Sequence, residues 1–98
     1  MNVTQAIAHA RSVISVHGTH TNWIVIGPYA GIDGPYTEAR RSSYAAASRL
    51  AADWKYQIAL MALGCSSDDA FFASEDRFGP WEPLVRRYAK EKRVASMA

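Results

Sequence analysis

The chain has 98 residues, of which 49% are hydrophobic and 20% charged, and its formal net charge is +2. A chain of this length predicts one domain over residues 1–98, with a modest hydrophobic core. So small a charge does not by itself indicate a nucleic-acid-binding protein, and the sequence has no run of 18 apolar residues that would span a membrane.

The first third of the chain predicts a short helix followed by a β-hairpin. Residues 4–11 favour a helix, because apolar residues recur there at helical spacing: Val3, Ile7, Ala10 and Ile14. Residues 12–17 and 23–26 are rich in β-branched residues and read as strands, with a turn between them at 18–22. Gly27-Pro28 ends the second strand, and a loop rich in glycine and proline follows.

Residues 37–63 predict one long helix, about 40 Å in length. The segment contains no glycine or proline and is rich in good helix formers, and Gly64 follows where a helix often ends. One stripe along it is apolar: Tyr44, Ala47, Ala51, Trp54, Ile58 and Met61. We expect the hairpin to pack on this stripe, because a two-stranded hairpin is not stable alone in water.

The C-terminal third predicts two short helices. Ser66 can cap a helix that reaches about Asp76, and residues 81–93 form the last helix. Leu60 and Leu63 lie off the main stripe and should pack under three aromatic residues: Phe71, Phe72 and Trp81. The expected fold class is α+β: a short N-terminal helix, a β-hairpin on one long central helix, and two short C-terminal helices.

No constellation in the sequence predicts an enzyme or a cofactor. His17 and His20 could bind a metal with Cys65, but zinc usually takes four ligands and no second cysteine is present. As a nucleophile Cys65 is poorly placed, because the C-terminal end of a helix disfavours a thiolate. The sequence contains neither G-x-x-x-x-G-K-[ST] nor G-x-G-x-x-G, the two glycine-rich motifs that bind phosphate groups. We therefore expect no catalytic residue, no metal and no cofactor.

The sequence favours a binding function instead. Arginine and aromatic side chains are the usual anchors of protein interfaces, and aromatic rings can also stack on nucleic-acid bases. We expect the aromatic residues near the hairpin and its loop to be exposed, together with basic residues of the long and last helices. The candidate partner-binding residues are Trp23, Tyr29, Tyr36, Arg40, Arg41, Arg86, Arg87, Lys90 and Arg93.

One family resemblance rests on two stretches of the chain. Trp23-Ile24-Val25-Ile26-Gly27-Pro28, followed by a loop and by Tyr44-Ala45-Ala46-Ala47 in an alanine-rich helix, resembles short orphan proteins of bacteriophages and integrative elements. Some of these are anti-CRISPR inhibitors, most of which are non-enzymatic and cover a surface of a CRISPR effector complex. The resemblance implies a phage or mobile-element inhibitor. It carries over no functional residue, because such proteins share no common motif.

Three functions therefore stay open. The first is an inhibitor that occludes a bacterial protein or ribonucleoprotein complex, and the second is a nucleic-acid-binding accessory or regulatory protein that uses the basic helices. The third, a small enzyme or metal protein, has no supporting motif. The lone cysteine, with no signal-peptide pattern at the start of the chain, predicts a cytoplasmic protein without membrane contact.

Overall fold

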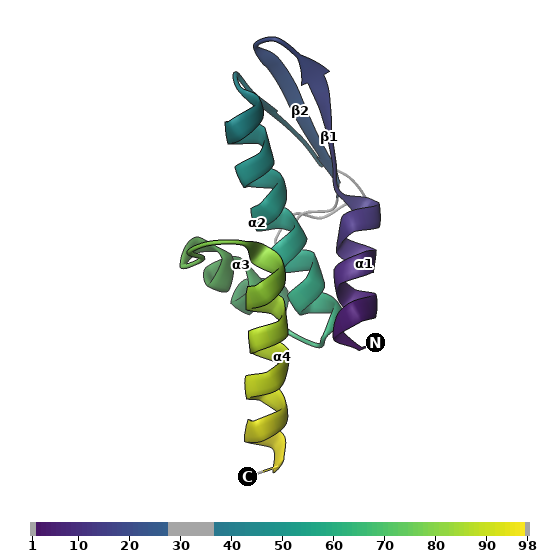
Figure 1. Ribbon diagram of the computed structural model, residues 1–98, viewed down its shortest axis with the longest axis vertical. Coiled ribbons are helices and arrows are strands. Elements are labelled where there is room, and N and C mark those ends of the chain that lie inside the picture. The colour runs from purple at the N-terminus through teal and green to yellow at the C-terminus, as the bar shows by residue number, and fades with distance from the viewer. Residues whose placement is uncertain (1, 28–36, 98) are drawn as a thin grey trace.

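The protein is an elongated α+β molecule of 50 × 27 × 22 Å (Figure 1). The computed structural model describes residues 2–27 and 37–97, and the side chains of residues 2–27 and 38–91. The elements follow one another as α1 (Val3–Val13), β1 (Ser15–Thr19), β2 (Asn22–Gly27), β3 (Thr37–Arg41), α2 (Tyr44–Ala62), α3 (Ser67–Glu75) and α4 (Trp81–Met97). The expected α+β class, with a hairpin packed on a long central helix, is confirmed.

Helix α1 begins with a capping box. The Asn2 side chain accepts a hydrogen bond from the Gln5 backbone N–H, 2.8 Å, and the Gln5 side chain accepts one from the Asn2 backbone N–H, 3.0 Å. The helix then continues to Val13, so the predicted strand at 12–17 was placed too early. The extra residues continue the helical hydrogen bonds up to Ile14, whose backbone N–H donates to the Ala10 carbonyl at 3.3 Å.

The sheet contains a third strand that the sequence did not predict. Its order is β1-β2-β3, antiparallel throughout, and β3 pairs with β2 so that Ala39 lies opposite Val25. The predicted helix over residues 37–63 was therefore wrong at its start. The backbone of β3 gains hydrogen-bond partners from β2, and this tertiary pairing outweighs the helix propensity of Ala39 and the arginines.

The α2 helix begins where a serine can cap it. The Ser43 side chain accepts a hydrogen bond from the Ala46 backbone N–H at 3.2 Å, which satisfies one of the free donors of the first turn. From Tyr44 to Ala62, α2 contacts every other element of the structure. It is therefore the central helix, although it is shorter than the sequence predicted.

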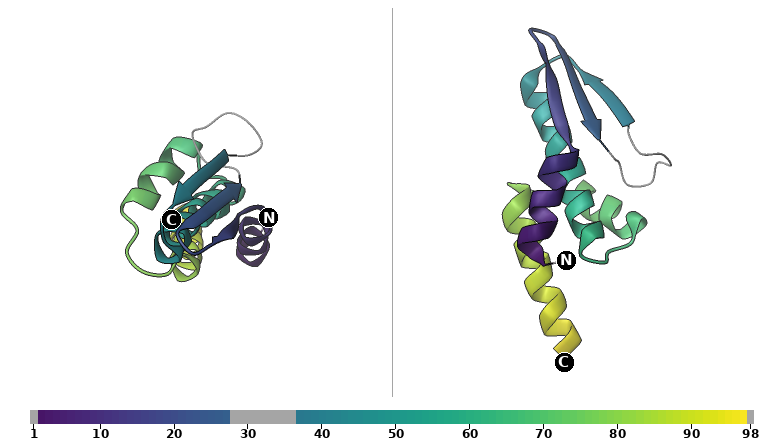
Figure 2. Two further views of the ribbon diagram at one scale, coloured as in Figure 1. Left: turned by 90° about the horizontal axis from the view of Figure 1, so that it is seen from above. Right: turned by 90° about the vertical axis from the view of Figure 1, so that its right-hand side faces the viewer.

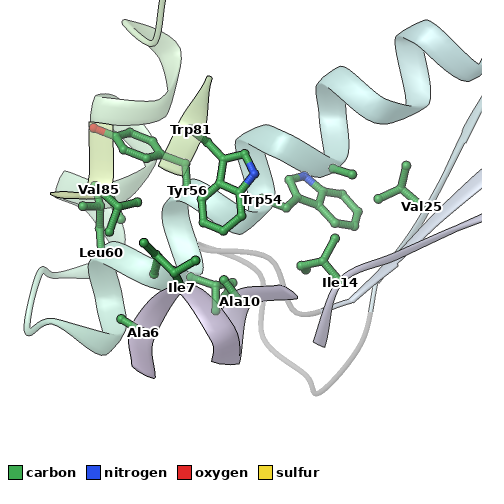
Figure 3. Packing of buried hydrophobic residues seen from close by; sticks show 14 of the residues in the cluster. Ala6, Ile7, Ala10, Ile14, Val25, Trp54, Tyr56, Leu60, Trp81 and Val85 are labelled. Atoms are coloured by element: carbon green, nitrogen blue, oxygen red, sulfur yellow. The ribbon is translucent and has the colours of Figure 1, made fainter. Parts of the chain in front are cut away.

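The hydrophobic core surrounds α2 along most of its length (Figure 3). Trp54, 3% exposed, lies towards Ile14 and Val25, between α1 and the sheet. The predicted stripe is confirmed at Ala47, Ala51, Trp54 and Ile58, which are all buried. It is wrong at its two ends, because Tyr44 is 59% exposed and Met61 is 36% exposed.

The C-terminal helices complete the lower part of the core. Leu60 and Trp81 are buried as expected, but Phe72 is 61% exposed and does not cover α2. Its helix turns Ala70 and Ser74 inwards, which places Phe72 on the opposite side. Helix α4 is not short: it runs to Met97, and its last turns project beyond the other elements (Figures 1 and 2).

Polar contacts hold these helices against their neighbours. Gln57 Nε2 donates to Ser74 Oγ at 2.7 Å, which joins α2 to α3 inside the protein. Arg11 of α1 forms an ion pair with Glu82 of α4 at the surface. The orientation of α3 and α4 on α2 is therefore defined by directional contacts as well as by apolar packing.

Candidate partner-binding surface

An aromatic pair marks the end of the molecule where the hairpin meets the start of α2. The ring centroids of Trp23 and Tyr44 lie 5.0 Å apart, with an interplanar angle of 60°. Trp23 Nε1 donates a hydrogen bond to the His20 carbonyl at 2.7 Å. Trp23 is half-buried rather than fully exposed, whereas Tyr44 presents more than half of its surface to solvent. The pair is thus fixed in orientation and still accessible.

The turn of the hairpin explains how Trp23 reaches this position. The two-residue loop His20-Thr21 joins β1 to β2, and His20 has a positive φ of 54°, as tight hairpin turns require. Gly18 lies opposite Trp23, and a Cβ at Gly18 would lie 2.2 Å from the Asn22 carbonyl oxygen. The glycine therefore permits the two strands to approach closely beside the tryptophan.

Arg40 and Arg41 extend the aromatic pair across β3. Arg41 lies directly opposite Trp23 in the strand register, and its Nη1 donates to the Arg40 carbonyl at 2.7 Å. Arg40 points to the other face of the sheet, where its Nη1 donates to Asn22 Oδ1 at 3.2 Å. Both arginines are exposed. We call Trp23, Arg41 and Tyr44 the hairpin-end surface; Arg40 lies beside it, on the other face of the sheet.

Most of the charged side chains at this end are positive. Among residues 15–27 and 38–50, the charged side chains are Arg40, Arg41, Arg49 and Glu38. The start of α2 lies at the same end and adds the partial positive charge of a helix N-terminus. The hairpin-end surface therefore favours a partner that presents carboxylates or other anionic groups next to apolar area.

The remaining basic candidates lie at the other end of the molecule. Arg86, Arg87 and Lys90 are exposed on α4, which extends away from the sheet (Figure 1). Arg87 Nε pairs with Glu91 Oε1 at 3.0 Å, so part of its charge is balanced locally. Arg93 belongs to α4, but its side chain lies outside the described part, as do Tyr29 and Tyr36. The predicted site residues thus divide into two separate groups.

The structure adds exposed aromatic residues that the sequence reasoning had assigned to the core. Tyr44 was placed in the buried stripe, and Phe72 was expected to pack on α2. For Phe72 a signal was available: Asp68, Asp69, Glu75 and Asp76 lie one turn before or after it on the same helix face. Such flanking by carboxylates indicates a solvent-facing position.

The side chains considered for chemistry do not converge. His17 Nε2 lies 2.9 Å from Ser15 Oγ on β1, whereas Cys65 follows the far end of α2. Within residues 2–27 and 38–91, no three His, Cys, Asp or Glu side chains are grouped to hold a metal ion. Burial raises the pKa of the Tyr56 phenol, and the neighbouring Cys65 and Tyr88 raise it further. Tyr56 therefore stays protonated at neutral pH, and its ring packs in the hydrophobic core.

Comparison with known proteins provides no evidence on the function. No family model matches the chain, and no match was found among curated proteins or among solved structures. In the described ranges, no helix has both the length and the apolar character needed to cross a membrane.

Proposed function

We propose that this protein is a small, non-enzymatic binding protein that covers a surface of another macromolecule with its hairpin-end surface. The observation that carries the proposal is the exposed, oriented Trp23–Tyr44 pair with Arg41 opposite Trp23. Tryptophan, tyrosine and arginine dominate the binding energy of protein interfaces. Here the aromatic pair is held by the strand register and by the Trp23 hydrogen bond. The two side chains therefore lose little conformational entropy on binding.

The distribution of charge favours a protein partner over nucleic acid. A nucleic-acid-binding face usually carries a continuous stripe of cations that follows the phosphates. Here Arg40 and Arg41 lie on β3, whereas α4, which carries the other cations, extends away from the sheet (Figure 1). Between them, α3 exposes acidic residues. A compact basic and aromatic surface fits the anionic, partly apolar surface of a folded protein better than it fits an extended strand.

The specific role we propose is that of an inhibitor from a phage or mobile element, acting in the bacterial cytoplasm. The support for this role is the resemblance of the chain to short orphan proteins, some of which inhibit CRISPR effector complexes. Its partner would be a bacterial protein or ribonucleoprotein complex. Inhibition would follow from occlusion, which needs a rigid binding surface and no catalytic group.

Affinity capture from a bacterial lysate, with and without nuclease, tests the proposal. We expect a stoichiometric protein partner that stays bound after nuclease treatment. The paired change Arg41→Glu and Tyr44→Ala should remove it, because both side chains are exposed at the hairpin end. Phe78→Ala is the matched control: it removes an aromatic ring that is 89% exposed but lies in the α3–α4 connection.

The nucleic-acid alternative makes the opposite prediction in the same experiment. If nuclease abolishes capture, and the purified protein binds arbitrary DNA or RNA with a steep loss of affinity as salt rises, the protein proposal is wrong. A captured partner supports the inhibitor role when its activity falls in proportion to added wild-type protein. The same activity should not respond to the Arg41→Glu, Tyr44→Ala variant.

A further inference from the structure

Within the described part of the chain, no other element covers the outward face of α3, where Phe72 is exposed. Phe72, at the centre of this face, is 61% exposed. Its ring makes an edge-to-face contact with the ring of Phe71, and the two ring centroids lie 5.8 Å apart. The buried side of the same helix is formed by Ala70 and Ser74. A phenylalanine held outwards in this way leaves most of its ring in contact with solvent, where a partner can reach it.

Four carboxylates surround this phenylalanine. Asp68 and Asp69 precede it by one turn, and Glu75 and Asp76 follow it by one turn, all of them exposed. None of the four forms an ion pair with another described side chain. We call Asp68, Asp69, Phe72, Glu75 and Asp76 the α3 face.

The nearest cation in the sequence is turned away from this face. The Arg77 side chain is only 10% exposed, because its Nε pairs with Asp53 Oδ1 at 2.8 Å and its Nη1 donates to the Gly79 carbonyl. The charge of the α3 face is therefore not balanced within the described chain. Carboxylates around an aromatic ring suit a cationic side chain, which can pair with the acids and stack on the ring.

The chain itself carries a complementary surface on α4. Arg86 and Lys90 lie one turn apart, are exposed, and make no ion pair with another described side chain. The second half of α4 projects past the other elements, so another molecule can lie along it (Figures 1 and 2). Both surfaces belong to one molecule, but no ion pair joins them among the described side chains.

We propose that the α3 face binds α4 of a second copy of this chain. Each copy carries both surfaces, so a dimer with two-fold symmetry makes the contact twice. In each contact, Arg86 and Lys90 of one copy meet the carboxylates of the other, and the Phe72 ring receives a guanidinium or an alkyl stem. This association uses neither Trp23 nor Tyr44, so it leaves the hairpin-end surface free for a partner.

Sedimentation equilibrium of the purified full chain tests the association directly. We expect a monomer–dimer equilibrium with a dissociation constant of about 10–100 µM, as is usual for a small and polar interface. Raising the salt from about 0.05 M to about 0.5 M should weaken it about tenfold, because the contact depends on exposed charges. Phe72→Ala should also weaken it, without unfolding α3, since alanine is a better helix former.

Charge reversal on each surface identifies which residues are in contact. Glu75→Lys with Asp76→Lys reverses the end of the α3 face, where added cations suit the helix C-terminus and should not unfold it. Arg86→Glu with Lys90→Glu reverses the α4 surface. Each variant alone should be monomeric, and an equimolar mixture of the two should form a dimer again, because each surface then meets its opposite charge.

A third variant tests whether a change in net charge alone, wherever it is placed, dissociates the dimer. Arg40→Glu with Arg41→Glu changes the net charge by the same amount as the α4 variant, but at the hairpin end, and should leave the dimer intact. The proposal is overturned if the wild type stays monomeric up to about 0.5 mM, which would assign the α3 face to another molecule. It is equally overturned if the hairpin-end variant dissociates the dimer as far as the α4 variant does, or if the mixture stays monomeric.

Discussion

Asp53 in the middle of α2 forms an ion pair with Arg77, two residues after the end of α3, with 2.8 Å between Oδ1 and Nε. Because the Arg77 side chain is 10% exposed, its charge has little contact with water once Asp53 is removed. We expect Asp53→Asn to lower the free energy of unfolding by about 2 kcal/mol, measured by urea denaturation. Arg11→Ala breaks the more exposed pair with Glu82 and should cost less than about 1 kcal/mol. An equal decrease in the free energy of unfolding in the two variants would show that the burial of Arg77 does not increase the cost of breaking its ion pair.

Trp54 is the large aromatic side chain of α2 that packs between α1 and the sheet. Replacing it with alanine leaves a cavity, and we expect Trp54→Ala to cost about 3–5 kcal/mol of stability. Phe78→Ala, at a side chain that is 89% exposed, should change stability by no more than about 0.5 kcal/mol. An unchanged denaturation midpoint for Trp54→Ala would contradict the core described for α2.

Gln57 is buried, and only one of the two polar atoms of its side-chain amide has a hydrogen-bond partner. Its Nε2 donates to Ser74 Oγ, but its Oε1 has no hydrogen-bond partner among the described residues. Ser74→Ala should therefore cost about 1–2 kcal/mol, because it leaves the whole amide of Gln57 unpaired in the core. The double variant Gln57→Leu, Ser74→Ala should recover most of that loss, which thermal denaturation of the three proteins can measure. A double variant less stable than Ser74→Ala alone would argue against this prediction.

The hairpin turn allows a matched pair of backbone variants. His20 adopts a positive φ of 54°, which glycine accepts without strain, so His20→Gly should raise stability by about 0.5 kcal/mol. Gly18→Ala should lower it by about 2 kcal/mol, because the added Cβ would meet the Asn22 carbonyl oxygen at 2.2 Å. Chemical denaturation checks both. Stabilisation by Gly18→Ala would mean that β1 and β2 do not approach as described.

Tyr56 makes stability depend on pH in the alkaline range. Its pKa is raised in the folded protein, chiefly by burial, whereas in the unfolded chain the phenol titrates near its ordinary pKa of 10.0. Above that pH the unfolded state loses the proton first, so stability should fall as pH rises. Tyr56→Phe should remove this share of the loss in denaturation curves recorded on both sides of pH 10. An equal slope in wild type and Tyr56→Phe would refute the assignment.

Periodicity along the sequence was sufficient to predict the α+β class, the buried positions from Ala47 to Ile58, and the helix that Ser66 caps. These features depend on local physics: the 3.6-residue spacing of apolar residues and a serine that satisfies free N–H groups. The basic and aromatic composition also predicted Trp23, Arg40 and Arg41 as candidates, but not that the strand register would place Arg41 opposite Trp23 and Arg40 on the other face.

Only the tertiary structure decided which helix-forming and apolar residues follow their local preference. Residues 37–41 have good helix propensity, yet they form β3 because β2 offers its backbone an edge to pair with. Tyr44 and Phe72 have the size of core residues, yet both are exposed, since α2 extends beyond the core at its start and α3 turns its alanine and serine inwards. Propensity is a property of a few neighbouring residues, whereas strand pairing and exposure depend on elements that are distant along the chain and meet only in the folded protein.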